Sequence, residues 1–232
     1  MTSSTWHALG NTYVVVEPKD GPLDAVRARV LAHGTDGVLE VLDRGADAVE
    51  IAIWNPDGSR AELSGNGTRI AAAWLAELTG ASEITVDVAG RLVRAHLLES
   101  GEIEQEMGAV VVGEEETVDG ITFVPVTVGN PHAVVIGDPA QIGAVGPILE
   151  THERFPERTN VQVARIDGPG EVTARVWERG VGETLSSGTS AVAVAAATHT
   201  DGEIVVHFPG GDLRVRLDQG RATLYGTAER VA

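Results

Sequence analysis

The sequence contains no cysteine among its 232 residues, which excludes disulfide bonds, thiolate metal sites and cysteine nucleophiles from this chain. Lysine is nearly absent as well, because Lys19 is the single exception among 17 basic residues that are otherwise arginine. Lys19 lies in the turn-like segment EPKDGP. A pyridoxal-phosphate enzyme needs a lysine that forms a Schiff base with its cofactor, so the sequence argues against that class.

Long apolar runs and an excess of basic charge are also missing. No apolar run approaches the roughly 18 residues of a membrane span, and the N-terminal MTSSTWHALG lacks the order of a signal peptide, so we expect a cytoplasmic protein. The formal net charge of −17 argues against a nucleic acid or an anionic membrane as partner. The seven histidines show no ligand-like pairing, so no metal site is expected.

What is present is an internal similarity between the two halves of the chain. LGNTYVVVE, from Leu9, resembles VGNPHAVVIGD, from Val128, and SEITVDVAGRLVRAHLL resembles GEIVVHFPGGDLRVRLD. A third match lies between these segments in each half: Trp54 precedes Ser64 by ten residues, and Trp177 precedes Ser187 by ten residues. Chance similarity among Val- and Ala-rich segments is the alternative, but three matches in the same order favour a duplication.

Each half predicts the same succession of elements: a strand, a long loop with a further strand, a polar turn, an Ala-rich helix and a hairpin. The helical segments IAAAWLAEL and AVAVAAA are apolar on every face, so they should be buried on all sides. We therefore predict an α/β (α+β) fold of two pseudo-symmetric repeats, each a curved mixed sheet around a central helix. The acidic stretch between 110 and 120 suits an exposed connection, which predicts domains at 1–115 and 116–232.

Two polar turns stand where the Ala-rich helices should begin. A helix start leaves backbone N–H groups without partners, and its dipole favours negative charge there. Glycines let a ligand approach that backbone, so both turns could hold a carboxylate or phosphate oxygen. The alternative is that each serine only caps its helix, but two equivalent turns in facing repeats favour a ligand that they share. The turns are Ser64-Gly65-Asn66-Gly67 and Ser187-Gly188-Thr189.

Asparagine recurs in the remaining polar clusters, and Glu178-Arg179 precedes the second serine turn. Asparagine is common in turns for backbone reasons alone, and an arginine often only pairs with a neighbouring glutamate. Together, however, amide groups and an arginine can bind the ammonium and carboxylate groups of a ligand, because a guanidinium holds a carboxylate through two hydrogen bonds. The asparagines are Asn11, Asn55, Asn130 and Asn160.

These residues lie in segments that, in order and over essentially the whole chain, resemble diaminopimelate epimerase. The segments are LGNTYVVVE, WNPDGSRAELSGNGTR, VGNPHAVV, GPILETHERFPERTNVQ, VWERGVGETLSSGTSA and FPGGDLRV. The resemblance implies a cofactor-independent cytoplasmic isomerase of lysine and peptidoglycan precursor biosynthesis, which converts LL- to meso-diaminopimelate. It also implies two mirrored domains with the active site in the cleft between them, and a possible homodimer.

The same resemblance implies a role for each polar residue. In the family, two cysteines on opposite sides of the substrate remove and deliver the proton at Cα, and Ser64 and Ser187 match their positions. His132 and Glu178 would assist these two acid/base residues. The matching positions for binding the amino-acid substrate are Asn11, Asn55, Gly65, Asn66, Asn130, Asn160, Arg179, Gly188 and Thr189.

Serine at both acid/base positions leaves three explanations. The chain could be a natural epimerase that uses serines or other groups, a variant whose cysteines were replaced to trap a substrate complex, or a paralogue that binds an amino acid without isomerising it. A hydroxyl is a far weaker acid than a thiol, whose pKa is roughly 8.5, so an active enzyme needs a neighbour that activates the serine. Ser186 and Ser190 also differ from the family's usual turn, which favours natural divergence.

Overall fold

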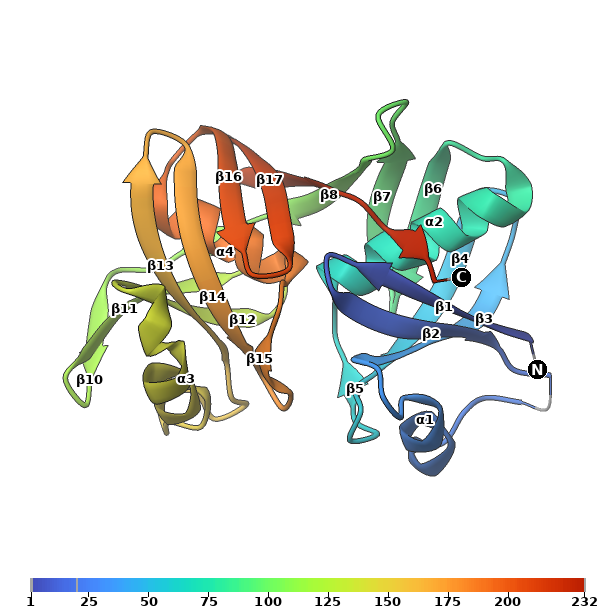
Figure 1. The fold of residues 1–232 in the computed structure, drawn as a ribbon, viewed down its shortest axis with the longest axis horizontal. Helices are drawn as coiled ribbons and strands as arrows, with labels where there is room; N and C mark the ends of the chain where they lie inside the picture. The colour runs from blue at the N-terminus through green and yellow to red at the C-terminus, as the bar shows by residue number, and fades with distance from the viewer. Residues whose placement is uncertain (1, 20, 232) are drawn as a thin grey trace. The chain divides into compact units, whose positions relative to one another are not determined.

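The computed structural model describes residues 2–19 and 21–231, which divide into two compact units. Unit 1 runs from the N-terminus to Glu106 and includes the segment from Tyr225 onward, and unit 2 is Met107–Leu224. The chain therefore passes from one unit to the other within two strands, β8 (Ile103–Ala109) and β18 (Arg221–Gly226) (Figure 1). The domain division predicted at residue 115 stays a prediction.

Unit 1 is a mixed sheet with two helices. Its strands pair in the order β1–β2 antiparallel, β2–β3 parallel, β3–β4 antiparallel, β4–β6 parallel and β6–β7 antiparallel. The short β19 adds to β1, and β7 pairs with β8. The elements are β1 (Thr2–Ala8), β2 (Asn11–Glu17), α1 (Ala25–Leu31), β3 (Gly37–Arg44), β4 (Ala48–Trp54), β5 (Arg60–Ala61), α2 (Gly65–Thr79), β6 (Glu83–Val88), β7 (Arg91–Leu97) and β19 (Glu229–Arg230).

Unit 2 repeats that order. Its strands pair as β11–β12 antiparallel, β12–β13 parallel, β13–β14 antiparallel, β14–β16 parallel and β16–β17 antiparallel. This alternation matches that of unit 1 step by step, so the predicted two-repeat α+β fold is confirmed. The elements are β9 (Val111–Val112), β10 (Glu116–Val118), β11 (Ile121–Thr127), β12 (Pro131–Ile136), η1 (Pro139–Gln141), α3 (Ile142–Glu150), β13 (Asn160–Gly168), β14 (Glu171–Glu178), β15 (Gly182–Thr184), α4 (Gly188–Thr198), β16 (Gly202–Phe208) and β17 (Gly211–Asp218).

Each unit is built around one central helix. Helix α2 contacts β1, β2, β4, β6 and β7, and α4 contacts strands β11 to β14, β16 and β17 (Figure 1). The first eleven residues of α2 and the first eight of α4 are buried on every face, as their all-round apolar character predicts. Alanine is the commonest residue in both helices, and its small side chain lets the surrounding strands approach closely.

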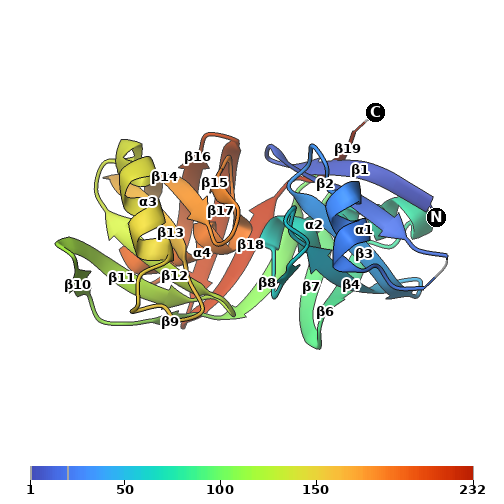
Figure 2. The ribbon, with the colours of Figure 1, turned by 90° about the horizontal axis from the view of Figure 1, so that it is seen from below.

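The outer helices α1 and α3 occupy corresponding places. Helix α1 packs on β3 and β4, and α3 packs on β13 and β14 (Figure 2). The first five residues of both β3 and β13 are consequently buried without alternation, because a helix covers each face of these strands. No helix among residues 2–19 and 21–231 is long and apolar enough to cross a membrane.

In both units a buried glutamate accepts a hydrogen bond from a tryptophan, which is buried in unit 1 and half-buried in unit 2. In unit 1, Trp54 Nε1 donates to Glu40 at 2.8 Å, and the backbone N–H of Leu23 donates to the same carboxylate at 2.6 Å. In unit 2, Trp177 Nε1 donates to Glu150 at 2.8 Å, and the Gly180 N–H donates to it at 2.7 Å. An arginine completes each pair: Arg60 lies 3.4 Å from Glu40, and Arg158 lies 2.7 Å from Glu150.

Candidate active site

The first polar turn begins at Ser64, which is the N-cap of α2. Its backbone is extended, and its Oγ accepts the Gly67 N–H at 2.9 Å. The Tyr13 hydroxyl lies 3.3 Å from the same Oγ. A side chain at Gly67 would meet Leu39 Cδ2 at 3.1 Å and Ser64 Cβ at 3.2 Å, so this turn is packed closely enough to favour glycine. Ser64 therefore does cap its helix, and its oxygen sits among hydrogen-bond donors.

Behind this turn lies a buried arginine. Arg69 is fully buried, and its Nη2 donates to Asn66 Oδ1 at 2.7 Å while its Nε donates to the Thr227 carbonyl at 3.0 Å. Burial lowers the pKa of Arg69 to about 10, which leaves it charged at neutral pH. Gly65 and Asn66, the first two residues of α2, are buried with it. Asn66 is thus held by its own helix.

The second polar turn differs in its side-chain contacts. Ser187 is the N-cap of α4 and is likewise extended, but its side chain makes no capping hydrogen bond. Its carbonyl accepts the Ala191 N–H at 2.9 Å, so the backbone cap forms without the hydroxyl. Gly188 and Thr189 open the helix and are buried, and Ser187 itself is only 4% exposed.

His132 lies in a buried polar network of unit 2. Its Nε2 is 2.8 Å from Asn130 Oδ1, and its Nδ1 is 3.0 Å from Gln162 Nε2. Because an amide nitrogen can only donate, Nδ1 must accept and the ring proton lies on Nε2, which donates to Asn130. Burial lowers the His132 pKa to about 3, so the ring is neutral at physiological pH. Gln162 also donates to Ser190 Oγ at 2.9 Å.

Asn160 begins β13, and Arg179 lies in the turn that directly follows β14. The Arg179 backbone N–H donates to Asn160 Oδ1 at 3.0 Å, and Asn160 Nδ2 donates to the Pro131 carbonyl at 3.0 Å. The Arg179 guanidinium donates to the Glu157 carbonyl at 3.2 Å. The neighbouring Glu178 accepts the Thr184 hydroxyl at 2.6 Å.

Asn11 and Asn55 lie in turns of unit 1. Asn11 is buried and begins β2 after a tight turn in which Leu9 and Gly10 have φ values of 49° and 86°. Both residues of such a turn need positive φ, which explains the glycine. Asn55 Nδ2 donates to Ser59 Oγ at 2.9 Å within the turn that follows β4. The substrate-binding roles of these residues stay predictions.

Sequence reasoning missed three residues that contact the predicted site residues: Tyr13, Arg69 and Gln162. Two of them carried a readable signal. Gln162 interrupts an otherwise apolar run at the start of β13, and Arg69 directly precedes the apolar run IAAAWLA of α2. A buried polar residue in such a position needs a partner and therefore points to a network. Tyr13 gave no such signal.

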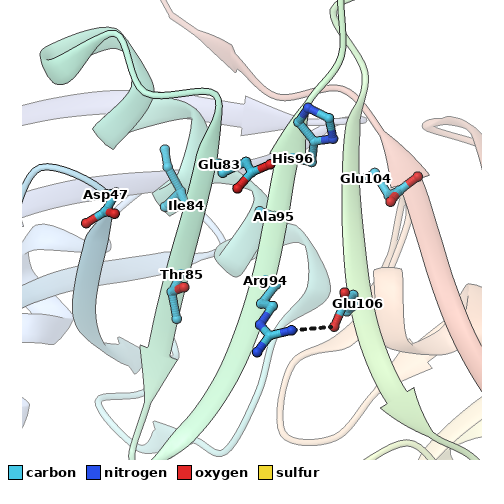
Figure 3. A pocket seen from close by; sticks show the side chains of 9 residues that line it. All are labelled: Asp47, Glu83, Ile84, Thr85, Arg94, Ala95, His96, Glu104 and Glu106. Carbon is cyan, nitrogen blue, oxygen red and sulfur yellow. Dashed lines mark ion pairs between the residues drawn. The ribbon is translucent and has the colours of Figure 1, made fainter.

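A hollow of about 410 Å³ lies elsewhere in unit 1, on β6, β7 and β8. Figure 3 shows its side chains on neighbouring strands, with Arg94 and Glu106 paired at 4.0 Å. It contains none of the predicted site residues, and no group of metal-ligating side chains occurs among the residues that the structure describes. Its lining comprises Asp47, Glu83, Ile84, Thr85, Arg94, Ala95, His96, Glu104 and Glu106.

Comparison with known proteins decides the family. The family model described as diaminopimelate epimerase matches residues 4–113 and 124–231. The chain is 35% identical to diaminopimelate epimerase 2 of Nostoc sp. over 91% of its own length and 87% of that protein. It is also 35% identical to the diaminopimelate epimerase of Desulforudis audaxviator, over 100% of this chain and 97% of that one. The chain belongs to the diaminopimelate epimerase family.

Solved structures extend this likeness to the fold. A protein described as a predicted epimerase from Pseudomonas aeruginosa superposes with a TM-score of 0.78 at 18% identity, covering 99% of this chain and 96% of that one. A hydroxyproline epimerase from Agrobacterium vitis gives a TM-score of 0.73 at 16% identity, covering 99% and 90%. The predicted diaminopimelate epimerase-like fold and the predicted enzyme class, an isomerase of the epimerase type, are confirmed.

Proposed function

We propose that this protein inverts the configuration at the α-carbon of diaminopimelate without a cofactor, converting the LL to the meso form. The observation that carries the proposal is the match of the diaminopimelate epimerase family to both repeats of the chain, over residues 4–113 and 124–231. Relatives that are 34–35% identical over nearly the whole chain bear that name. The function places the protein in lysine and peptidoglycan precursor biosynthesis, in the cytoplasm, and we expect a homodimer.

The chemistry assigns one acid/base group to each polar turn. Ser64 and Ser187 act on opposite faces of one α-carbon, so that one removes a proton while the other delivers one. The backbone N–H groups at Gly65–Asn66 and Gly188–Thr189 receive the α-carboxylate, because helix N-termini favour anions. The remaining amino and carboxylate groups of the substrate are bound by the other predicted binding residues, Asn11, Asn55, Asn130, Asn160 and Arg179.

A serine can act as a base only if its surroundings stabilise the alkoxide. Ser64 has two such neighbours, since the Gly67 N–H donates to its Oγ and the Tyr13 hydroxyl lies 3.3 Å away. His132 and Glu178 remain the residues that we propose to assist the two acid/base groups. A His132 whose pKa is about 3 is a weak base, so its contribution is to position Asn130 rather than to store a proton.

A second candidate function is favoured by the two hydroxyl groups themselves. A protein that keeps both turns but lacks thiols could bind the amino acid without isomerising it. The two functions differ in a single step, the exchange of the α-proton with solvent.

Incubation with LL-diaminopimelate in heavy water tests the proposal, because each turnover places deuterium at Cα. Mass spectrometry should show deuterated meso product that increases with enzyme concentration. The Ser64→Ala and Ser187→Ala variants serve as matched controls and should form no meso product, because inversion needs both groups. Tight binding of diaminopimelate in calorimetry, without any deuterium incorporation at high enzyme concentration, would establish the binding function instead.

A further inference from the structure

Arg69 is an unusual buried residue because its charge has only neutral partners. Its side chain is 0% exposed, and its guanidinium donates to the Thr227 carbonyl and to the Asn66 amide oxygen. No carboxylate within the described residues lies at ion-pair distance from it, and burial alone accounts for its lowered pKa. Buried charges are normally paired, since removing a charge from water without a counter-ion costs several kcal/mol. The buried charge of Arg69 lowers stability in this way, which indicates a functional role for it.

The position of Arg69 connects that charge with the first polar turn. It follows Ser64 by five residues on α2, and its partner Asn66 is the second residue of the same helix. The guanidinium charge therefore adds to the positive end of the helix dipole, which already favours an anion at this turn. In unit 2, the residue five places after Ser187 is Val192, which is apolar and fully buried.

We propose that Arg69 is a positioning residue that fixes Asn66 and makes the turn at Ser64 the more electropositive of the two turns. The proposal rests on the proposed function only in treating position 64 as an acid/base group. A carboxylate bound at Gly65–Asn66, or an ionised group at position 64, gains from this charge. The group at position 64 should therefore ionise at a lower pH than the group at position 187.

The absence of native cysteine allows a direct test. The Ser64→Cys and Ser187→Cys variants each carry one thiol, whose pKa follows from the pH dependence of alkylation by iodoacetamide, measured by intact mass. We expect the thiol at position 64 to have a pKa about one unit below that at position 187. Adding Arg69→Met to Ser64→Cys should raise the pKa by about one unit, which lowers the thiolate fraction at neutral pH roughly tenfold.

Four further variants separate the charge of Arg69 from other causes. Arg69→Lys in the Ser64→Cys background keeps the charge and should keep the low pKa. Arg94→Met removes an arginine whose side chain is 76% exposed and should leave both thiols unchanged. Tyr13→Phe in the Ser64→Cys background measures how much the nearby Tyr13 hydroxyl contributes to the thiol pKa. Arg69→Met with Ser187→Cys should leave the thiol at position 187 unaffected, because Val192 stands at the corresponding position of α4.

Equal thiol pKa values at positions 64 and 187, or a lower value at 187, would overturn the proposal even if Arg69→Met failed to fold. So would a folded Arg69→Met variant, verified by circular dichroism, in which the thiol at position 64 titrates as before. None of these measurements uses a substrate. A failure of the proposed epimerase activity would therefore appear in the deuterium assay alone, and a failure of this inference in the thiol titration alone.

Discussion

The two polar turns begin with the same residue type and the same backbone geometry, yet their surroundings differ. Ser64 accepts the Gly67 N–H and has the Tyr13 hydroxyl nearby, whereas Ser187 makes no capping hydrogen bond. Behind Ser64 lies the buried positive charge of Arg69. Beside α4, Gln162 joins His132 and Ser190 in a network of neutral side chains, and the charged Arg179 acts on His132 from outside it. The repeat thus preserved the positions of the two serines but not their electrostatic setting.

The tryptophan–glutamate pairs show the opposite behaviour. Trp54 with Glu40 and Trp177 with Glu150 have the same indole hydrogen bond, a backbone N–H on the same carboxylate, and an arginine beside it. The two glutamates come from different elements, Glu40 from β3 and Glu150 from the end of α3, so the two units reach the same set of contacts from different positions in the repeat. We infer that the features common to both units support the fold, and that the features that differ between the turns serve the chemistry.

The largest expected effect comes from restoring thiols to both turns. The double variant Ser64→Cys with Ser187→Cys should increase deuterium incorporation into diaminopimelate by about 10² to 10⁴, because a thiol has a pKa much nearer to neutrality than a hydroxyl. Each single variant should gain far less, since inversion needs an acid and a base together. Rates measured under identical conditions for all four proteins test this. A single variant as active as the double would contradict the two-base assignment.

The next effect tests whether the two tryptophan–glutamate pairs are equivalent. Glu40→Gln and Glu150→Gln each remove a buried charge and turn one acceptor into a donor that faces an N–H group. We expect each to lower the free energy of unfolding by about 3 kcal/mol, equally within about 1 kcal/mol. Urea denaturation measures both, with the exposed Glu106→Gln as a control that should change little. A difference of more than about 1 kcal/mol between the two losses would show that the two pairs do not stabilise their units equally.

These comparisons indicate what the sequence can and cannot predict. The two-repeat fold can be predicted from the order and spacing of the motifs. The interval from tryptophan to serine recurs in both halves, and each half contains an Ala-rich helix that must be buried. The difference between the turns does not follow, because it depends on residues distant in sequence: Tyr13 reaches Ser64 from β2, and Gln162 reaches Ser190 from β13. Spacing predicts which elements form, whereas side-chain partners appear only once the chain is folded.

A smaller effect concerns the packing of Trp177. A methyl group at Gly146 in α3 would lie 2.7 Å from Trp177 Cβ and Cγ, so Gly146→Ala should destabilise unit 2 by about 1–3 kcal/mol although alanine favours helices. Gly143 in the same helix has open space at that point, and Gly143→Ala should be neutral or stabilising by up to about 1 kcal/mol. Thermal unfolding of the two variants distinguishes the clash from the propensity. If both stabilised the protein, the packing around Trp177 would be looser than described.

The smallest expected effect is a loss of stability on acidification that His132, in the network beside α4, should produce. The folded pKa of His132 is about 3, below its ordinary value of 6.5, so the unfolded chain binds the proton first as the pH falls. The contribution of His132 to stability is therefore complete above pH 6.5 and is lost progressively between pH 6.5 and 3, amounting to about 1 kcal/mol by pH 5.5. Urea denaturation between pH 7 and 5 should show this loss in the native protein and a flatter profile in His132→Gln.

A second histidine of unit 2 provides the control with the opposite sign. Hydrogen bonds from His207 to Asp212 and Glu171 raise the pKa of His207, so its stabilisation is present at acid pH and is lost as the pH rises through that raised value. His207→Gln should therefore lower stability at acid pH, whereas His132→Gln should reduce the loss of stability on acidification. If His132→Gln left the acid dependence unchanged, the pKa of His132 in the folded protein would lie near its ordinary value of 6.5. The ring could then assist one of the two acid/base groups, and the electrostatic contrast between the two turns would be smaller than the structure indicates.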